Sequence, residues 1–304
     1  MEKEKEVELV DLDEKEYNKV NEKQEKKTKK SNINPFSLIS IVFIIILILG
    51  IIFITYYYKR TNKIELIIAN DYDEMSKLAA EIFSDLIKKN PNSNLGLATG
   101  STPLGLYNEL IKKNQNKEIT FKNISTYNLD EYCGIPRNHP QSYYSFMKNH
   151  LFNYIDINLN NTHIPKAEGD IEINIKNYEE MLNKNKINLQ LLGVGRNGHI
   201  GFNEPGTHFN IGVHEVDLEG KTIQDNARFF ENDINKVPKK AITMGIKNIL
   251  DADIIILMAN GTKKSDAVKY VMSGIVDENI PVSSLNTHKG KVYVIVDKDA
   301  ASKL

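Results

Sequence analysis

The sequence predicts an α/β domain with a mostly parallel sheet, preceded by one transmembrane helix. Two patterns predict it. Between residues 63 and 304, short β-branched runs alternate with longer amphipathic stretches, which is typical of a layered α/β domain. Before that region, residues 36–58 carry no charged side chain, and a run of this length is typical of a bilayer-spanning helix. The length of 304 residues suits one large domain or two small ones, and the alternation requires only one.

The first 35 residues form a charged tail. They hold ten acidic side chains and nine lysines, with few large apolar residues. Such a segment cannot bury enough apolar surface to offset the entropy that ordering would cost. We therefore expect residues 1–35 to be disordered.

Residues 36–58 are predicted to cross a lipid bilayer. As a helix with a rise of about 1.5 Å per residue, they would reach roughly 34 Å, and the hydrocarbon core is about 30 Å thick. Tyrosines 56–58 and the cations at 59–60 are typical of the headgroup edge. A cleaved signal peptide would need a shorter apolar run and a small-residue cleavage site, and neither is evident. A buried core helix is the other alternative, but few soluble folds bury a helix that is apolar all round.

Within the domain, strands and helices are expected to alternate. The run at 64–69 is strand-like, and residues 73–89 repeat apolar side chains at spacings of three and four, the period of an amphipathic helix. Further strands are expected at 94–98, 124–127, 187–192, 253–258 and 291–296. Further helices are expected at 103–113, 141–152, 173–182 and 263–272.

Charge and cysteine content argue against two classes of function. The chain has 39 Lys and Arg against 40 Asp and Glu, so a general attraction to nucleic acid is not supported and we expect no nucleic-acid partner. The single cysteine, Cys133, excludes an intramolecular disulfide and a cysteine-cluster zinc site. We expect Cys133 to be a packing residue rather than a nucleophile.

A hydroxyl-rich turn follows the strand at 94–98. Glycine lets the backbone approach a ligand closely, hydroxyls donate hydrogen bonds, and Pro103 suits a first helical turn whose free N–H groups favour an anion. The turn consists of Thr99, Gly100, Ser101 and Thr102. A phosphate site and an N-capped turn without a ligand both fit these residues.

Two acids, Asp130 and Glu131, follow the next strand, where open α/β sheets collect ligand-binding groups. A partly buried carboxylate there could act as a base, whereas an exposed pair would be solvated charge.

Residues 193–206 contain five glycines together with His199 and Glu204. The glycines allow a tight loop around a small ligand, and a histidine held by a carboxylate can relay protons near neutral pH. A surface histidine is the alternative. Two later cations, Arg228 and Lys264, suit phosphate, although single cations are usually solvated and these count only beside the turn at 99–102.

In this order and spacing, these stretches resemble the glucosamine-6-phosphate deaminase family from residue 63 to the C-terminus. The motifs are ATGSTP at 98–103, NLDEY at 128–132, YYSFM at 143–147, GHIGFNEPG at 198–206 and RFF at 228–230. The resemblance implies a Rossmann-like three-layer fold. It also implies conversion of glucosamine 6-phosphate and water to fructose 6-phosphate and ammonia, a step of amino-sugar catabolism, without a metal or an organic cofactor.

The resemblance also implies roles for single residues. Asp130 would move a proton from C2 to C1 of the sugar through a cis-enolamine, and His199, oriented by Glu204, would open the sugar ring. Position 197 is Asn, where some family members have an Asp that assists ring opening. Asn197 can orient His199 by a hydrogen bond but cannot share its positive charge. The implied phosphate-binding residues are Thr99, Gly100, Ser101, Thr102, Arg228 and Lys264.

The predicted membrane helix departs from the family, which is ordinarily soluble and cytosolic. More cations precede the helix, at 23–30, than follow it, at 59–63, and this bias would place the domain outside the cytosol. Because the implied substrate is a cytosolic phosphosugar, we prefer a domain that faces the cytosol.

Two rival functions and one question of assembly remain at this stage. The rivals are a 6-phosphogluconolactonase-like hydrolase and a non-catalytic, membrane-bound phosphosugar sensor. The sensor would be expected to lose Asp130 or His199, and both are present. A homo-oligomer stays open, because interface patches cannot be located without the fold.

Overall fold

The computed structural model describes the backbone of residues 35–61 and 63–304, and the side chains of residues 40–53 and 63–304. The chain divides into two units, Met1–Thr61 and Asn62–Leu304. Apart from Pro35, the tail predicted to be disordered over 1–35 lies outside the described residues.

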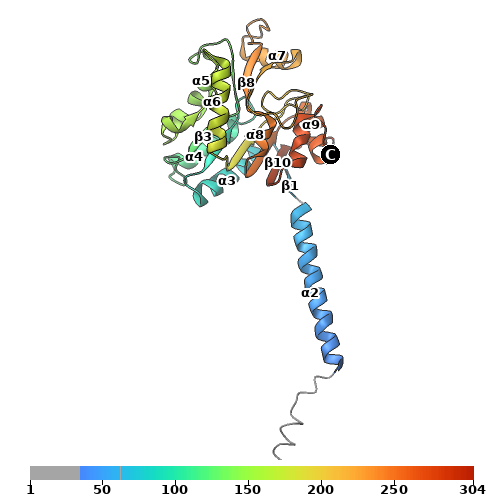
Figure 1. The fold of residues 1–304 in the computed structure, drawn as a ribbon. Helices are drawn as coiled ribbons and strands as arrows, with labels where there is room; N and C mark the ends of the chain where they lie inside the picture. Colours follow the sequence, from blue (N-terminus) through green and yellow to red (C-terminus); the bar gives the residue numbers. More distant parts are fainter. Residues whose placement is uncertain (1–34, 62) are drawn as a thin grey trace, which may run out of the picture. The chain divides into compact units, whose positions relative to one another are not determined.

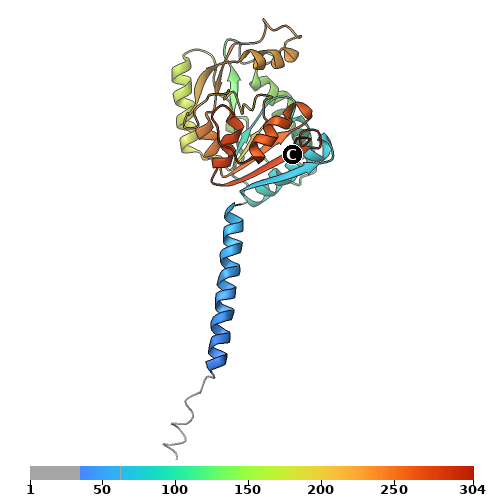
Figure 2. The same cartoon turned by 90° about the vertical axis from the view of Figure 1, so that its right-hand side faces the viewer.

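The described part of the first unit is one helix, α2 (Pro35–Thr61) (Figure 1, Figure 2). Its described apolar side chains are exposed, for example Phe43 at 66% and Phe53 at 67%. Among the residues with described side chains, no helix has the length and apolarity needed to cross a membrane. In α2 those residues are 40–53, a shorter run than the about 20 apolar residues of a typical span. The helix is thus present at the predicted place, but the prediction that 36–58 crosses a membrane is not confirmed.

The second unit is built on a seven-stranded sheet of order β1-β10-β9-β6-β2-β3-β5. All its strand pairs are parallel, which confirms the predicted α/β class. Its strands are β1 (Ile64–Ala69), β10 (Lys291–Asp297), β9 (Ile254–Ala259), β6 (Leu189–Leu192), β2 (Asn94–Leu97), β3 (Ser125–Asn128) and β5 (Thr162–His163). Apart from the buried Gln190 of β6, the central strands β6 and β9 are apolar, because helices cover both faces of the sheet.

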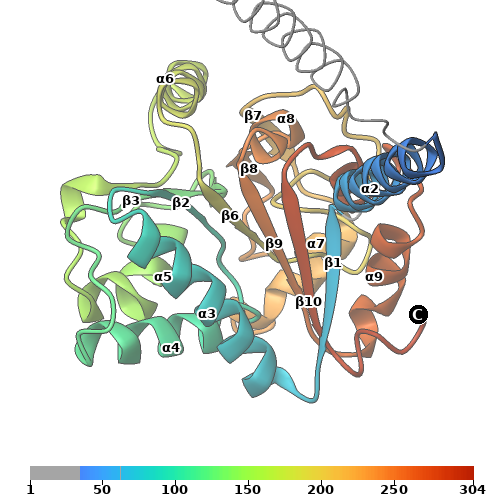
Figure 3. The same cartoon turned by 90° about the horizontal axis from the view of Figure 1, so that it is seen from below.

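Helices form the two outer layers. Figure 3 shows α3, α4 and α5 on one side of the sheet and α6 and α8 on the other. The bounds are α3 (Tyr72–Lys89), α4 (Leu104–Gln115), α5 (Tyr143–His150), α6 (Ile171–Lys184), α8 (Ile246–Leu250) and α9 (Ser265–Met272). In α3, the Asp71 side chain caps the helix by accepting from the Glu74 N–H, and Met75, Ala79 and Phe83 form its buried stripe.

A second, three-stranded antiparallel sheet has the order β4-β8-β7, with β4 (Asp130–Tyr132), β8 (Lys240–Thr243) and β7 (His214–Asp217). Helix α7 (Gly220–Asn226) lies between β7 and β8 in the sequence. A separate hydrophobic cluster holds this region together and includes Tyr132, Phe202 and Phe230. The sequence prediction missed these short strands, because none shows enough residues for a clear period.

The observed helices differ from the predicted ones by one or two residues at their ends, and in two of them the structure shows the local cause. The helix expected at 141–152 begins only at Tyr143, since the Ser142 side chain caps it by accepting from the Ser145 N–H. The helix expected at 263–272 is split into a 3₁₀ turn, η4 (Thr262–Lys264), and α9. This turn presents Lys264 close to the end of β9.

Candidate active site

A cavity of about 670 Å³ opens at the carboxyl ends of the parallel strands. Its lining comes from the segments that follow β2, β6 and β9, joined by Asp130 of β4 and by α7. In open α/β sheets, strand ends on this side supply the ligand-binding groups. Of the predicted site residues, those that line the cavity are Thr99, Gly100, Ser101, Thr102, Asp130, His199, Arg228 and Lys264.

One corner of the cavity joins the turn at 99–102 to the segment that follows β9. The Thr102 hydroxyl donates to the Asn260 side-chain oxygen at 3.0 Å. The Asp297 carboxylate at the end of β10 accepts from the Gly261 N–H, with both oxygens at 3.0 Å. These bonds tie loops from three strands into one wall.

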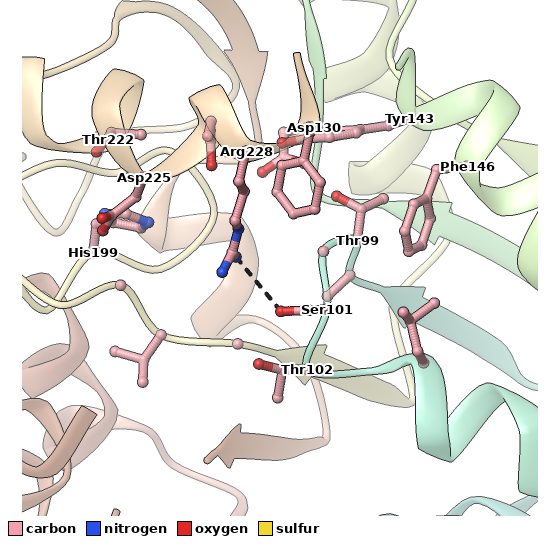
Figure 4. A pocket seen from close by; sticks show the side chains of 18 of the residues that line it. Thr99, Ser101, Thr102, Asp130, Tyr143, Phe146, His199, Thr222, Asp225 and Arg228 are labelled. Carbon is pink, nitrogen blue, oxygen red and sulfur yellow. Dashed lines mark hydrogen bonds between the residues drawn. The ribbon is translucent and has the colours of Figure 1, made fainter. Parts of the chain in front are cut away.

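Cations gather on this wall. The Arg228 guanidinium lies 3.5 Å from the Ser101 hydroxyl (Figure 4, dashed line), and Lys264 lines the same cavity. Burial lowers the pKa of Lys264 to about 8, helped by the neighbouring charges of Arg228 and Arg196. A guanidinium and an ammonium beside the hydroxyls of residues 99–102 suit a phosphate group.

The sequence analysis missed two further cations that line the cavity, Arg196 and Lys263. Arg196 pairs with Asp225 of α7 at 3.2 Å. The sequence feature that could have identified Arg196 as a site residue is its position inside the glycine-rich loop at 193–206.

Asp130 is buried on β4, where it pairs with Thr243 of β8. Burial, followed by the charge of Glu131, raises the pKa of Asp130 well above its ordinary value. The glycine-rich loop passes beside it: Gly201 has a φ of 57°, and a Cβ there would come within 3.6 Å of the Asp130 Oδ2. A cavity-lining carboxylate with a raised pKa is suited to proton transfer.

Glu131 has a different role, which neither the residue pattern nor the family resemblance had predicted. Its carboxylate accepts hydrogen bonds from the backbone N–H groups of Tyr132, Tyr143 and Tyr144, at 2.8 to 2.9 Å. It therefore joins β4 to the N-terminus of α5. Cys133 does not line the cavity, and burial raises the pKa of its thiol to about 11, which does not favour a nucleophile.

The His199 side chain contacts Asn197 and Glu204, and neither of these two residues lines the cavity. The His199 Nδ1 lies 2.7 Å from the Asn197 Oδ1 and 3.4 Å from the Glu204 Oε2. Gly195 permits this arrangement, since a Cβ there would come within 2.3 Å of the imidazole. Burial alone would raise the pKa of Glu204, but hydrogen bonds from His199, Thr222 and Asn197 outweigh burial and lower it.

Aromatic side chains form another part of the wall. Tyr143 and Phe146 of α5 line the cavity near Thr99 (Figure 4). Tyr143 packs between Tyr132, at 4.8 Å between ring centroids, and Phe202, at 6.1 Å. The sequence analysis used their motif only for the resemblance and gave these rings no place in the site.

Comparisons with known proteins agree on one family. A family model described as glucosamine-6-phosphate isomerases/6-phosphogluconolactonase matches residues 70–294. The chain is 50% identical over 243 residues to the glucosamine-6-phosphate deaminase of Clostridium novyi (strain NT), covering 79% of this chain and 100% of that one. A deaminase of Clostridium botulinum (strain Kyoto / Type A2) is 49% identical over 243 residues, covering 79% and 99%.

Solved structures are similar as well. A monomeric glucosamine-6-phosphate deaminase has a TM-score of 0.76 at 42% identity and covers 80% of this chain and 100% of its own. A 6-phosphogluconolactonase from Trypanosoma brucei has a TM-score of 0.67 at 18% identity and covers 80% of this chain and 99% of its own. At that identity the second likeness concerns the fold alone.

Proposed function

Because the chain belongs to the glucosamine-6-phosphate isomerase/6-phosphogluconolactonase family, we propose that its cavity converts glucosamine 6-phosphate and water to fructose 6-phosphate and ammonia. The chain is an enzyme of the deaminase type, as its near relatives are. The single observation that carries the assignment of the site is Asp130, a buried carboxylate with a raised pKa, in the same cavity as a cationic wall.

The phosphate is the proposed anchor of the substrate. Arg228 and Lys264 would take its two negative charges, while the hydroxyls and N–H groups of residues 99–102 would bind its oxygens. Binding energy from this remote group can hold C2 of the sugar against Asp130. Orientation of this kind contributes a large part of enzymatic rate enhancement.

His199 is the proposed group for ring opening. Both neighbours of its Nδ1, the Asn197 Oδ1 and a Glu204 oxygen, are hydrogen-bond acceptors, so Nδ1 carries the proton. In the neutral imidazole, Nε2 is then left as the base. It would take the proton of the C1 hydroxyl and deliver it to the ring oxygen as the bond from C1 to that oxygen breaks.

Asp130 would then remove the proton from C2, which leaves a cis-enolamine with a double bond between C1 and C2. Return of the proton at C1 produces an imine at C2. Water adds to the imine carbon, and ammonia leaves as the ketone of fructose 6-phosphate forms. No electrons leave the substrate overall, which agrees with a site that needs only proton transfer.

The lactonase alternative is not favoured. The deaminase relatives are 48–50% identical to this chain, whereas the lactonase structure named above, at 18% identity, shares only the fold. A phosphosugar sensor without activity would not need a buried carboxylate with a raised pKa in the pocket.

The assignment of Asp130 predicts the effect of Asp130→Asn. Removing a general base costs about 10²- to 10⁴-fold in rate, so kcat for ammonia release should fall by about 10³-fold while KM changes little. Asp217→Asn, at an exposed position of β7, is the matched control and should keep wild-type turnover. Undiminished ammonia release by the Asp130→Asn variant would refute the assignment of the base.

We also propose that residues 36–58 attach the enzyme to a lipid bilayer and that the domain faces the cytosol, where its phosphosugar substrate is found. Two observations support attachment. The run carries no charge, and the described large apolar side chains of α2 are at least half exposed. So much exposed apolar surface is unfavourable in water.

A further inference from the structure

Asn197 sits between two carboxylates as well as beside the imidazole. Its side-chain nitrogen donates to the Glu204 Oε2 at 2.8 Å and to the Glu219 Oε2 at 3.1 Å. A side-chain amide has two N–H hydrogens, so each carboxylate takes one of them. The amide oxygen is left to face His199.

The direction of this amide favours one imidazole tautomer, because the Asn197 Oδ1 at 2.7 Å is the nearer of the two acceptors beside the His199 Nδ1, and the Glu204 Oε2 at 3.4 Å is the other. With the amide oxygen toward His199, Nδ1 donates, and Nε2 stays unprotonated in the neutral ring. If the amide turned over, its nitrogen would face Nδ1, only the more distant Glu204 oxygen would accept from Nδ1, and the tautomer with the proton on Nε2 would become more populated. Turning would also place the amide oxygen against two carboxylates. The amide would then lose its two charge-assisted hydrogen bonds, and its partly negative oxygen would be repelled by the negative carboxylates.

Glu219 is the N-cap residue of α7 and has an extended backbone. Two side chains of the helix itself contact the glycine-rich loop: Thr222 donates to Glu204, and Asp225 pairs with Arg196. Residues three apart lie near each other on a helix surface, so these two contacts hold α7 against the loop that carries His199. The N-cap position then places the Glu219 carboxylate beside the Asn197 amide.

We propose that Glu219 is a positioning residue for ring opening: together with Glu204 it locks the Asn197 amide in the direction that keeps the His199 Nε2 free to act as the base. This inference rests on the proposed function of His199 in ring opening. Neither the family motifs nor the cavity lining includes Glu219, since it acts from outside the cavity through Asn197.

The test uses the full chain with Glu219→Ala and Glu219→Gln. In Glu219→Ala the amide keeps one carboxylate only, so kcat should fall about tenfold, part of the about 10²- to 10⁴-fold that proton transfer contributes. KM should stay within about twofold, because the phosphate wall is untouched. The glutamine retains an acceptor oxygen without the charge, and its kcat should lie between those of the wild type and the alanine variant.

The direct readout is the tautomer of His199 in protein labelled with ¹⁵N-histidine. In the neutral form of the ring, the wild type should show a protonated Nδ1 and an unprotonated Nε2. Glu219→Ala should show the two nitrogen signals shifted toward each other as the tautomers mix. Loss of the signals in His199→Gln assigns them.

Glu215→Ala is the matched control, because Glu215 is an exposed acid of neighbouring β7 whose ion pair is with Lys240. It should change neither kcat nor the His199 signals. An unchanged tautomer in Glu219→Ala overturns the inference, whatever the activity. If the wild type releases no ammonia, the proposed function fails, but the tautomer signals still decide the role of Glu219. Melting temperatures of both Glu219 variants exclude unfolding as the cause of a loss.

Discussion

Lys264 is a residue whose charge the cavity itself controls. Burial and nearby cations lower its pKa to about 8, so the free enzyme has the ammonium below that pH and loses it above. A neutral amine attracts a phosphate dianion far less than an ammonium does. The two cations predicted to bind the phosphate therefore differ in charge above about pH 8. Lys264 loses its charge there, whereas Arg228 is a guanidinium and stays charged.

This difference predicts a pH dependence of substrate binding. Above about pH 8, KM should rise by up to tenfold per pH unit as Lys264 loses its proton, while kcat is less affected. In Lys264→Arg the rise should disappear, because an arginine keeps its charge. Initial rates across a series of buffers measure both. A wild-type KM that stays flat through two pH units above 8 would contradict binding through this ammonium.

At the level of elements, the N-terminus of α5 is tied to β4 through Glu131. The three backbone N–H groups that it accepts belong to a strand and to a helix that starts eleven residues after that strand ends. Because β4 also carries Asp130, the same tie sets the position of the proposed base. The two adjacent acids therefore have different roles: Glu131 joins β4 to α5, and Asp130 lines the cavity.

Removing this tie should lower stability more than a surface change would. Glu131→Ala leaves one buried and two part-buried N–H groups without their acceptor, and a fully buried group left unpaired costs about 1–3 kcal/mol. We expect a loss of at least about 1 kcal/mol in the free energy of unfolding of the domain. Glu180→Ala, at an exposed position of α6, should stay within about 0.5 kcal/mol of the wild type. Denaturant titration of both variants measures the difference, and equal midpoints would show that Glu131 has no structural role.

For the whole molecule, the proposed attachment through residues 36–58 would distinguish this chain from a free enzyme. The full chain should sediment with membranes and resist alkaline extraction. A variant with Ile45→Lys and Ile48→Lys should be released, because each lysine at the centre of a span costs about 2.5–3.5 kcal/mol. Recovery of the wild type in the soluble fraction would rule out the attachment. In sealed inverted vesicles, an externally added protease should digest a domain that faces the cytosol.

The sequence by itself was sufficient for the α/β class, for the alternation of the main strands and helices, and for the loops at 99–102 and 193–206. Hydrophobic period and glycine content are local properties, and local properties can be read along the chain. The tertiary structure alone decided that Glu131 ties β4 to α5, how β4, β8 and β7 pair, and that Glu219 reaches Asn197. Each of these depends on burial and on contacts between segments distant in the sequence, such as Asp130 with Thr243. Such contacts exist only once the chain has folded.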